Sequence, residues 1–477
     1  MTPKDTIEDT LGEPPAASRA EVGLKPSMHG FGALLITVTC LSPSIGVFVV
    51  GSDIVRQAGT GAFLCFVFAV IVGVAMAAVY GELSSAFPTT GGEYTIFGRA
   101  LGRRWAVVAL CLNLLGYSLA QSVSGLGVAT YLAPFLPGLP PAVVAAALVV
   151  VVTAIGVLNI RVNAWITGVF LAVEISALVL LAALGLLHPA RDATVLLHPV
   201  VLDAHHALTA PALVTIGVAA SGGIYAFNGY GAVVFLGEEM HEAPRRVAGV
   251  VFMALGVAVL TELLPLASVL LGAPDLKRLL AADSPVQAFV GERAPPWLAV
   301  AMSLGVALAI FNAMIAVALI AGRQLYATGR DQIWPAPISR FLAQIHPRLH
   351  SPWTATIVMG TAGLAGCLLS QKILVLLLGN GNVALYTGLC FATILGRRSG
   401  ATGHSGYRMP LFPLAPVFAL MALAGVVWFD LHDPDGAVGL LATVGCVVFG
   451  LAYYWIFLRH RTAWGFHDPQ AGVARAD

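Results

Sequence analysis

From Phe31 onward, the sequence consists of apolar stretches of about 20 residues that are separated by short polar links. A helix needs about 20 mostly apolar residues to cross the hydrocarbon layer of a membrane, so this pattern predicts a series of transmembrane helices. We expect spans near residues 31–57, 61–87, 105–134, 141–159, 164–187, 211–237, 247–272, 297–325, 353–370, 373–396, 411–430 and 437–458. The predicted fold is an all-α polytopic membrane protein with 12 transmembrane helices in these positions.

The composition agrees with this prediction and excludes several functions. Of the 477 residues, 58% are hydrophobic and 10% are charged, whereas soluble domains carry about 25% charged residues. A net charge of +1 without a basic patch gives no sign of nucleic-acid binding. The six cysteines lie in apolar runs without paired spacing, which predicts neither disulfides nor a zinc site. No Walker A or dinucleotide-binding motif is found, so we expect no cofactor, no metal and no enzymatic activity.

The distribution of Lys and Arg predicts the orientation of the chain. If the N-terminus lies inside, the inner segments hold 19 of the 25 Lys and Arg residues. The outer links then hold Arg56, Arg191, Lys277, Arg278, Arg293 and Lys372. Because cytoplasmic loops are enriched in positive charge, we expect both termini in the cytoplasm and a multi-pass protein of the cell (plasma or inner) membrane. Residues 1–28 read as a disordered cytoplasmic tail without the apolar core of a signal peptide, 29–460 as the membrane domain and 461–477 as a second cytoplasmic tail.

Two of the expected spans are interrupted. The first contains Pro43 and Gly46, and the sixth contains Asn228 among four glycines between Gly222 and Gly231. Irregular backbone at membrane depth is tolerated where it is buried or lines a cavity. Interrupted helices in matching positions of two halves are typical of a transporter binding site. The alternative interpretation is that these residues make kinks or packing faces, which are common in transmembrane helices.

Three segments carry a family resemblance. Residues Gly81–Tyr94 read GELSSAFPTTGGEY, residues Ala226–Tyr230 read AFNGY and precede Glu238 and Glu239, and residues Arg323–Asp331 read RQLYATGRD. In this order they resemble the second helix, the sixth helix with its exit loop, and the segment after the eighth helix of the amino acid–polyamine–organocation (APC) superfamily, whose members include amino acid permeases. The resemblance implies a LeuT-like fold, in which two five-helix repeats (about 31–187 and 211–396) have inverted topology, helices 1 and 6 are broken, and two extra helices follow (about 411–458).

The same resemblance implies a secondary active transporter that binds an amino acid between the broken helices. A substrate carboxylate needs hydrogen-bond donors and positive potential, and the start of the second half of helix 1 supplies both. The donors there are the amides of Ser44, Ile45 and Gly46. The family usually has Gly-Ser-Gly at these positions, so the backbone role is kept here while the side chains differ.

The substrate ammonium group needs acceptors, which unwound carbonyl groups provide. By the family pattern these lie near Ser42, Tyr225 and Asn228, and Tyr225 and Phe227 fall where relatives place gating aromatics. An aromatic residue at helical spacing can equally be a packing residue. Relatives that carry cationic substrates often have an acidic residue where this chain has Gly231, so we expect a neutral amino acid.

Acidic residues inside the expected spans are a further functional signal, because a charge in the hydrocarbon layer is costly. Glu174 lies deep in the fifth span, where many family members carry a lysine, counted from Asn159–Arg161. It is interpreted as a carrier of a coupling proton, as a ligand for an amine, or as a protonated carboxyl group hydrogen-bonded within the bundle. For Glu262 we expect a structural or outer-vestibule role, and for Glu82 and Glu93 helix ends or gating salt bridges.

The sequence leaves several functional alternatives open. Proton symport and substrate exchange are not separated, and the oligomeric state is not predicted. The alternative substrate is a polyamine or another organic cation, with Glu174 as its anchor. The alternative of another class is a transporter-like nutrient sensor, for which the tails are short. The expected partners are thus an amino acid or amine substrate, a proton and the lipid bilayer.

Overall fold

The computed structural model describes residues 29–89, 91–158, 164–203, 205–237, 240–349, 351–461 and 464. Within them the regular structure is helical except for one short antiparallel pair of strands, β1 (Val201–Leu202) and β2 (Leu208–Thr209). The two expected tails lie almost entirely outside the described residues.

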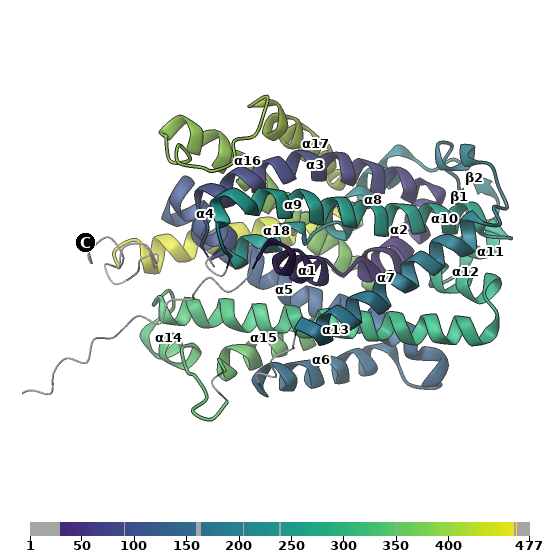
Figure 1. Cartoon of the computed structure of the whole chain (residues 1–477), viewed down its shortest axis with the longest axis horizontal. Coiled ribbons are helices and arrows are strands. Elements are labelled where there is room, and N and C mark those ends of the chain that lie inside the picture. Colours follow the sequence, from purple (N-terminus) through teal and green to yellow (C-terminus); the bar gives the residue numbers. More distant parts are fainter. Residues whose placement is uncertain are drawn as a thin grey trace, which may run out of the picture.

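The long helices lie side by side along the long axis of the molecule (Figure 1). The first half of the chain forms α1 (Gly30–Leu41), α2 (Ser52–Ala58), α3 (Ala62–Ala86), α4 (Gly92–Ala100), α5 (Arg103–Leu132), α6 (Pro141–Leu158) and α7 (Ala164–Leu186). The second half forms α8 (Leu213–Ala226), α9 (Ala243–Ala258), α10 (Leu264–Gly272), α11 (Leu276–Ala281), α12 (Pro285–Arg293), α13 (Pro296–Arg330), α14 (Ala336–Leu342), α15 (Trp353–Gly366), α16 (Gln371–Ser399), α17 (Leu414–Leu431) and α18 (Pro434–Tyr453).

Seven shorter segments have another helical geometry. Three are π-helical, η1 (Ile45–Gly51), η6 (Val259–Leu263) and η7 (Tyr454–Leu458), and four are 3₁₀-helical, η2 (Gly59–Gly61), η3 (Ala133–Phe135), η4 (Ala193–Leu196) and η5 (Tyr230–Leu236). π-Helical turns inside α-helices are rare and frequent at functional sites. Here η1 continues into α2, and η6 joins α9 to α10.

Among the described residues, nine helical stretches are long and apolar enough to cross a membrane. One of them, Gly30–Ala86, has 57 residues and would be about 85 Å long as a straight helix. It is not straight, because the chain turns back at Gly59, whose φ is +60° and whose position leaves no room for a Cβ atom against the carbonyl group of Val200. This stretch therefore contains two of the expected spans. The expected spans near 211–237 and 353–370 coincide with α8–η5 and α15, of which α8 and α15 have 14 residues each.

The outer surface of the bundle is apolar where it faces away from the core. Large apolar side chains such as Val150 on α6, Met421 on α17 and Leu441 on α18 are 54%, 63% and 70% exposed. A soluble protein does not tolerate apolar surface of this extent. Together with the nine stretches, it confirms the prediction of an all-α, multi-pass membrane protein.

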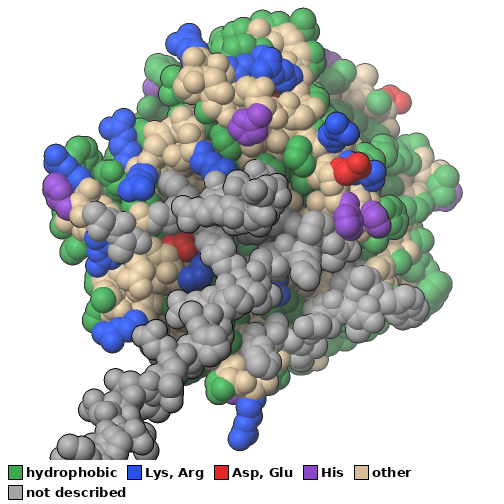
Figure 2. All heavy atoms as spheres, turned by 60° about the vertical axis from the view of Figure 1, so that its left-hand side comes forward, with side chains coloured by type: hydrophobic (Ala, Val, Ile, Leu, Met, Phe, Trp, Pro, Cys, Tyr) green, Lys and Arg blue, Asp and Glu red, His purple; other side chains and the backbone are tan. Residues whose placement is uncertain are grey.

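Positive charge gathers at one end of the bundle. Figure 2 shows Lys and Arg side chains spread over the end of the molecule that lies on the left in Figure 1. Arginines stand at the start of α5 and of α9 and at the end of α13 and of α16. The opposite end holds the β1–β2 hairpin together with α11 and α12.

Candidate functional site

The first expected span is broken where the sequence predicts it. Helix α1 ends at Leu41, and Ser42 takes up a left-handed conformation with φ of +46°. The next residue is Pro43, which has no amide donor and disfavours helical geometry in the residue before it. Helical structure resumes at Pro43, and the amides of Ile45 and Gly46 both donate to the carbonyl group of Ser42, over 2.9 and 3.4 Å.

The sixth expected span is broken in the same way. Helix α8 ends at Ala226, and the chain continues after Gly229, whose φ is +130°, as the 3₁₀-helical segment η5. A Cβ atom at Gly229 would lie 2.5 Å from the Cα atom of Leu41. The two breaks therefore touch, backbone against backbone, and only glycine allows this approach.

Glu174 reaches the break of the first span from α7. Its Oε1 atom accepts hydrogen bonds from the amide of Ser44 (2.8 Å) and from the hydroxyl group of Ser42 (2.9 Å). The Glu174 side chain is buried, with 3% of its surface exposed. The structure thus brings together the expected carboxylate-binding amide and the expected proton carrier. Residues 159–163, from which the position of Glu174 was counted, lie outside the described residues.

Glu262 lies against the same break, which the sequence did not predict. It belongs to the π-helical segment η6, is fully buried, and neither of its carboxyl oxygens has a hydrogen-bond partner among the described residues. Its carboxyl group occupies the place where a Cβ atom at Gly46 would stand. Of the two roles expected for Glu262, its complete burial favours the structural one, and the outer-vestibule role stays a prediction. The available signal was its isolation as the one acidic residue in an apolar span.

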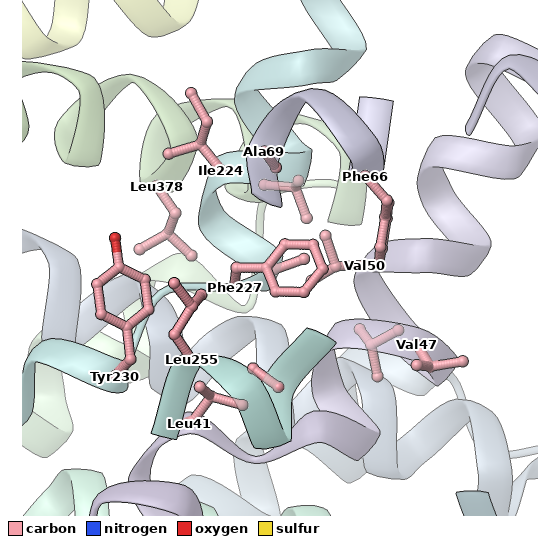
Figure 3. Close-up of a cluster of buried hydrophobic side chains, with 14 of the residues drawn as sticks. Leu41, Val47, Val50, Phe66, Ala69, Ile224, Phe227, Tyr230, Leu255 and Leu378 are labelled. Carbon is pink, nitrogen blue, oxygen red and sulfur yellow. The ribbon is translucent and has the colours of Figure 1, made fainter. Parts of the chain in front are cut away.

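The expected residues on the sixth span point in different directions. Phe227 is buried and packs edge-to-face on Phe66 of α3, with ring centroids 5.4 Å apart (Figure 3). The side chain of Asn228 donates to Asn382 of α16 over 3.2 Å. Tyr225 is half-buried, and its carbonyl group accepts the amide of Asn228 over 2.9 Å.

Polar side chains extend from the sixth-span break toward α4. The hydroxyl group of Tyr386 donates to the side chain of Asn228 over 3.4 Å, and its ring packs against that of Tyr80 at 6.0 Å. Tyr80 in turn donates to Glu93 over 3.0 Å. Sequence analysis did not select Asn382 and Tyr386, although their spacing of four residues places them on one face of a helix.

An ion pair closes the arginine-rich end between α3 and α16. Arg397 donates to both carboxyl oxygens of Glu82, over 2.6 and 2.5 Å, and the amide of Met409 donates to the same carboxyl group over 3.0 Å. Glu82 is 1% exposed. Glu82 thus forms a salt bridge, and the gating or helix-end role expected for it stays a prediction.

A cavity of about 710 Å³ is lined in part by Asp283 and Ser284, which lie between α11 and α12. Its wall includes Phe48 of η1 and Ser52 and Asp53 of α2, together with Tyr131 of α5. The hydroxyl group of Tyr131 donates to the carbonyl group of Phe48 over 3.0 Å. The cavity thus lies along the second half of the broken first span, from Phe48 to Arg56.

In the described part of the chain, no group of three or more His, Cys, Asp or Glu side chains is arranged to hold a metal ion. Asp203 accepts the amides of His205 and Ala207, as in a turn. Glu238 and Glu239 lie outside the described residues.

The comparison with known proteins identifies the family. The family model described as "Amino acid permease" matches residues 30–452. The chain belongs to this family. The branched-chain amino acid permease BcaP of Bacillus subtilis is 23% identical to this permease over 482 residues, which cover 96% of this chain and 97% of BcaP.

Two further relatives are named as transporters without an amino acid in their names. The methylthioribose transporter of Bacillus subtilis is 23% identical over 475 residues, covering 93% of this chain and 96% of the relative. An uncharacterized transporter of Mycobacterium tuberculosis is 28% identical over 320 residues, covering 66% of this chain and 68% of the relative. The resemblance to the APC superfamily is confirmed, and the permease is a transporter rather than an enzyme.

Proposed function

We propose that this permease is a secondary active transporter that moves neutral amino acids across the cell membrane by alternating access. The observation that carries the proposal is the contact between the two helix breaks, where Gly229 lies against Leu41 and Glu174 binds the amide of Ser44. Broken helices that meet in the interior of a bundle are typical of the substrate site of a secondary transporter, where the ends of the half-helices face the bound substrate.

The proposed architecture has 12 spans in a LeuT-like, five-plus-five inverted arrangement, with helices 11 and 12 appended. Support comes from the agreement of each expected span with a helix or a pair of helical segments, and from the breaks in spans 1 and 6. The gathering of arginines at one end supports cytoplasmic termini by the positive-inside rule.

In the proposed complex, the substrate carboxylate binds the amides of Ser44, Ile45 and Gly46. The ammonium group binds the carbonyl groups near Ser42, Tyr225 and Asn228. The cavity along η1 and α2 is the outer approach to this site.

Two observations support a neutral substrate. Position 231 is glycine rather than an acidic residue that could hold a cationic substrate, and a Cβ atom there would lie 2.9 Å from the ring of Tyr80, so that a larger side chain requires Tyr80 to shift. In addition, the chain aligns over nearly its whole length with a relative named as a branched-chain amino acid permease. A polyamine or organic cation is the second candidate, because two carboxyl groups, those of Glu174 and Glu262, face the break.

We propose Glu174 as the carrier of a coupling proton. A carboxyl group buried in a membrane protein and hydrogen-bonded to a broken helix is a functional group by default. Proton symport then uses the inward proton gradient to accumulate the substrate.

Uptake into proteoliposomes tests the proposal. The labelled panel contains leucine, alanine, lysine, putrescine and methylthioribose, each with and without an inward proton gradient. Accumulation of a neutral amino acid that collapses with the gradient supports symport. Acceleration by internal substrate without gradient dependence means exchange. Entry of putrescine alone overturns the substrate assignment, and binding without accumulation means a sensor.

A further inference from the structure

The carboxylate site proposed at the break of the first span is already occupied by a carboxyl group of the protein. The amide of Ser44 and the hydroxyl group of Ser42 both donate to the same oxygen of Glu174. The amides of Ile45 and Gly46 turn to the carbonyl group of Ser42 instead. A substrate carboxylate that uses the Ser44 amide must therefore replace Glu174.

The donors at the break of the first span stabilise one negative charge, that of Glu174. Few groups nearby could stabilise a second negative charge. The start of a helix carries roughly half a positive elementary charge. Among the described residues, the elements that pack on α7 bring no Arg or Lys side chain into an ion pair with Glu174. Helices α1 and α10 have no acidic or basic residue, and Arg293 of α12 instead donates to the carbonyl groups of Gly272 and His188.

The other elements that pack on α7, which are α12, α13 and η6, also bring no described cation to Glu174. Glu292 of α12 pairs with Arg278, and Arg323 and Arg330 lie in the last third of α13. The carboxyl group of Glu262 on η6 lies against Gly46, two residues from the Ser44 amide that Glu174 binds. In the described part of the chain, the surroundings of Glu174 therefore hold a second buried carboxyl group and no cation that could stabilise an additional negative charge.

We propose that the substrate carboxylate and the carboxylate of Glu174 compete for the Ser44 amide, and that each displacement of Glu174 takes up one proton. The inference rests on the proposed amino acid transport. Before binding, Glu174 is ionised and docked on Ser44 and Ser42, and Glu262 is protonated because nothing stabilises its charge. After binding, the substrate carboxylate holds these donors, and a proton from solvent is on the carboxyl group of Glu174.

This exchange couples the substrate to the proton at a fixed ratio. The number of negative charges at the break is one before and one after binding, so the ratio is one proton for each carboxylate. The coupling requires the carboxylate of the substrate and not its ammonium group. It also predicts that binding weakens as pH rises, because a proton is a reactant in the binding equilibrium.

Isothermal titration calorimetry of the whole protein in detergent tests the proposal. The probes are L-leucine, or the neutral amino acid that the uptake panel selects, and its amino alcohol, which for leucine is L-leucinol and lacks the carboxylate. Titrations at pH 8 in buffers with different ionisation enthalpies give the number of protons taken up. We expect about one proton for leucine and about zero for leucinol. We also expect the Kd of leucine to rise up to about tenfold per pH unit.

Two substitutions at the same break serve as a matched pair. Glu174→Gln should reduce the proton uptake with leucine to about zero and flatten the pH dependence of Kd. Glu262→Gln should keep an uptake of about one proton, because Glu262 is neutral in both states. Asp430→Asn is the control, because it removes a buried carboxyl group on α17, away from the break. It should leave the proton uptake with leucine at about one.

Several results overturn the proposal. Leucine binding without proton uptake, equal uptake with leucine and leucinol, or uptake that survives Glu174→Gln each contradicts the exchange. If Glu174→Gln does not fold, the comparison of leucine with leucinol on the unmodified protein still decides. A failure of the proposed function looks different, because then no amino acid of the panel binds or enters.

Discussion

At the residue scale, the break of the first span depends on the absence of a side chain at Gly46. The carboxyl group of Glu262 fills the space that a Cβ atom would need, and Glu262 is fully buried within η6. A methyl group at position 46 would therefore displace the carboxyl group of Glu262 from its buried place. A substitution at Gly46 therefore tests how tightly the Glu262 carboxyl group packs against the backbone of the first span.

We predict that Gly46→Ala destabilises the protein by about 1–3 kcal/mol, which is the usual cost of inserting a methyl group into a packed core. This cost exceeds the gain of up to about 1 kcal/mol that Ala has over Gly in a helix. The measurement is thermal unfolding in detergent, with uptake of leucine as the functional readout. We expect a lower unfolding temperature and reduced uptake.

The double substitution Gly46→Ala/Glu262→Ala identifies the cause. Glu262→Ala removes the group that the new methyl group overlaps, so the loss of stability in the double variant should be smaller than the sum of the single losses. Additive losses would show that Glu262 is not what limits the space at Gly46.

Individual side-chain contacts at the site were beyond sequence analysis. Glu174 and Ser44 are 130 positions apart, and Gly46 and Glu262 are 216 apart in the numbering. Contacts over such separations depend on how the helices are rotated and shifted against each other, which a single sequence does not encode in any local pattern. For the same reason, the packing of Phe227 on Phe66 could not be distinguished from a gating position.

At the element scale, the sequence carries much stronger local signals for the helices and their breaks than it does for individual side-chain contacts. The expected span 105–134 coincides with α5 (Arg103–Leu132), because a long apolar run can bury its backbone in a membrane only as a helix. The breaks follow from Pro43 and from the glycines near Asn228, whose effects on the backbone are local. The π-helical geometry of η1 and η6 has no comparable signal in the sequence and was not predicted.

The contact between the two breaks gives a prediction for Gly229. Its φ of +130° excludes other residues without strain, and a Cβ atom would overlap the backbone of Leu41, which cannot rotate away as a side chain can. We expect Gly229→Ala to lower stability by about 1–3 kcal/mol and to abolish uptake. Gly256→Ala on α9 is the control, because no atom lies within 4 Å of a Cβ atom there.

The comparison of the two variants separates strain from a general effect of methyl groups. Unfolding temperature and leucine uptake are measured for both in the same detergent and liposomes. Gly256→Ala should resemble the unmodified protein in both measurements. Equal behaviour of the two variants would show that the breaks do not need their close contact for transport.

At the scale of the whole molecule, the two ends of the bundle differ in charge. The end with α4, α14 and the link from α16 to α17 carries most of the arginines, and the opposite end carries the β1–β2 hairpin. If this asymmetry follows the positive-inside rule, the arginine-rich end faces the cytoplasm. The ion pair between Glu82 and Arg397 then closes the inner side of the transporter.

Accessibility of single cysteines to a membrane-impermeant maleimide tests this orientation in whole cells. The background is a variant in which the six native cysteines, which are buried or half-buried, are replaced by serine or alanine. Thr209→Cys in β2 and Ser399→Cys at the end of α16 place exposed thiols at opposite ends of the bundle. We expect Thr209→Cys to react from outside and Ser399→Cys to react only after the membrane is permeabilised, because a charged reagent cannot cross the hydrocarbon layer.

The reverse pattern would invert the proposed orientation, and the Glu82–Arg397 pair would then close the outer side instead. Since the direction of the inward proton gradient is defined relative to these sides, the result also decides which face of the permease Glu174 must load its proton from.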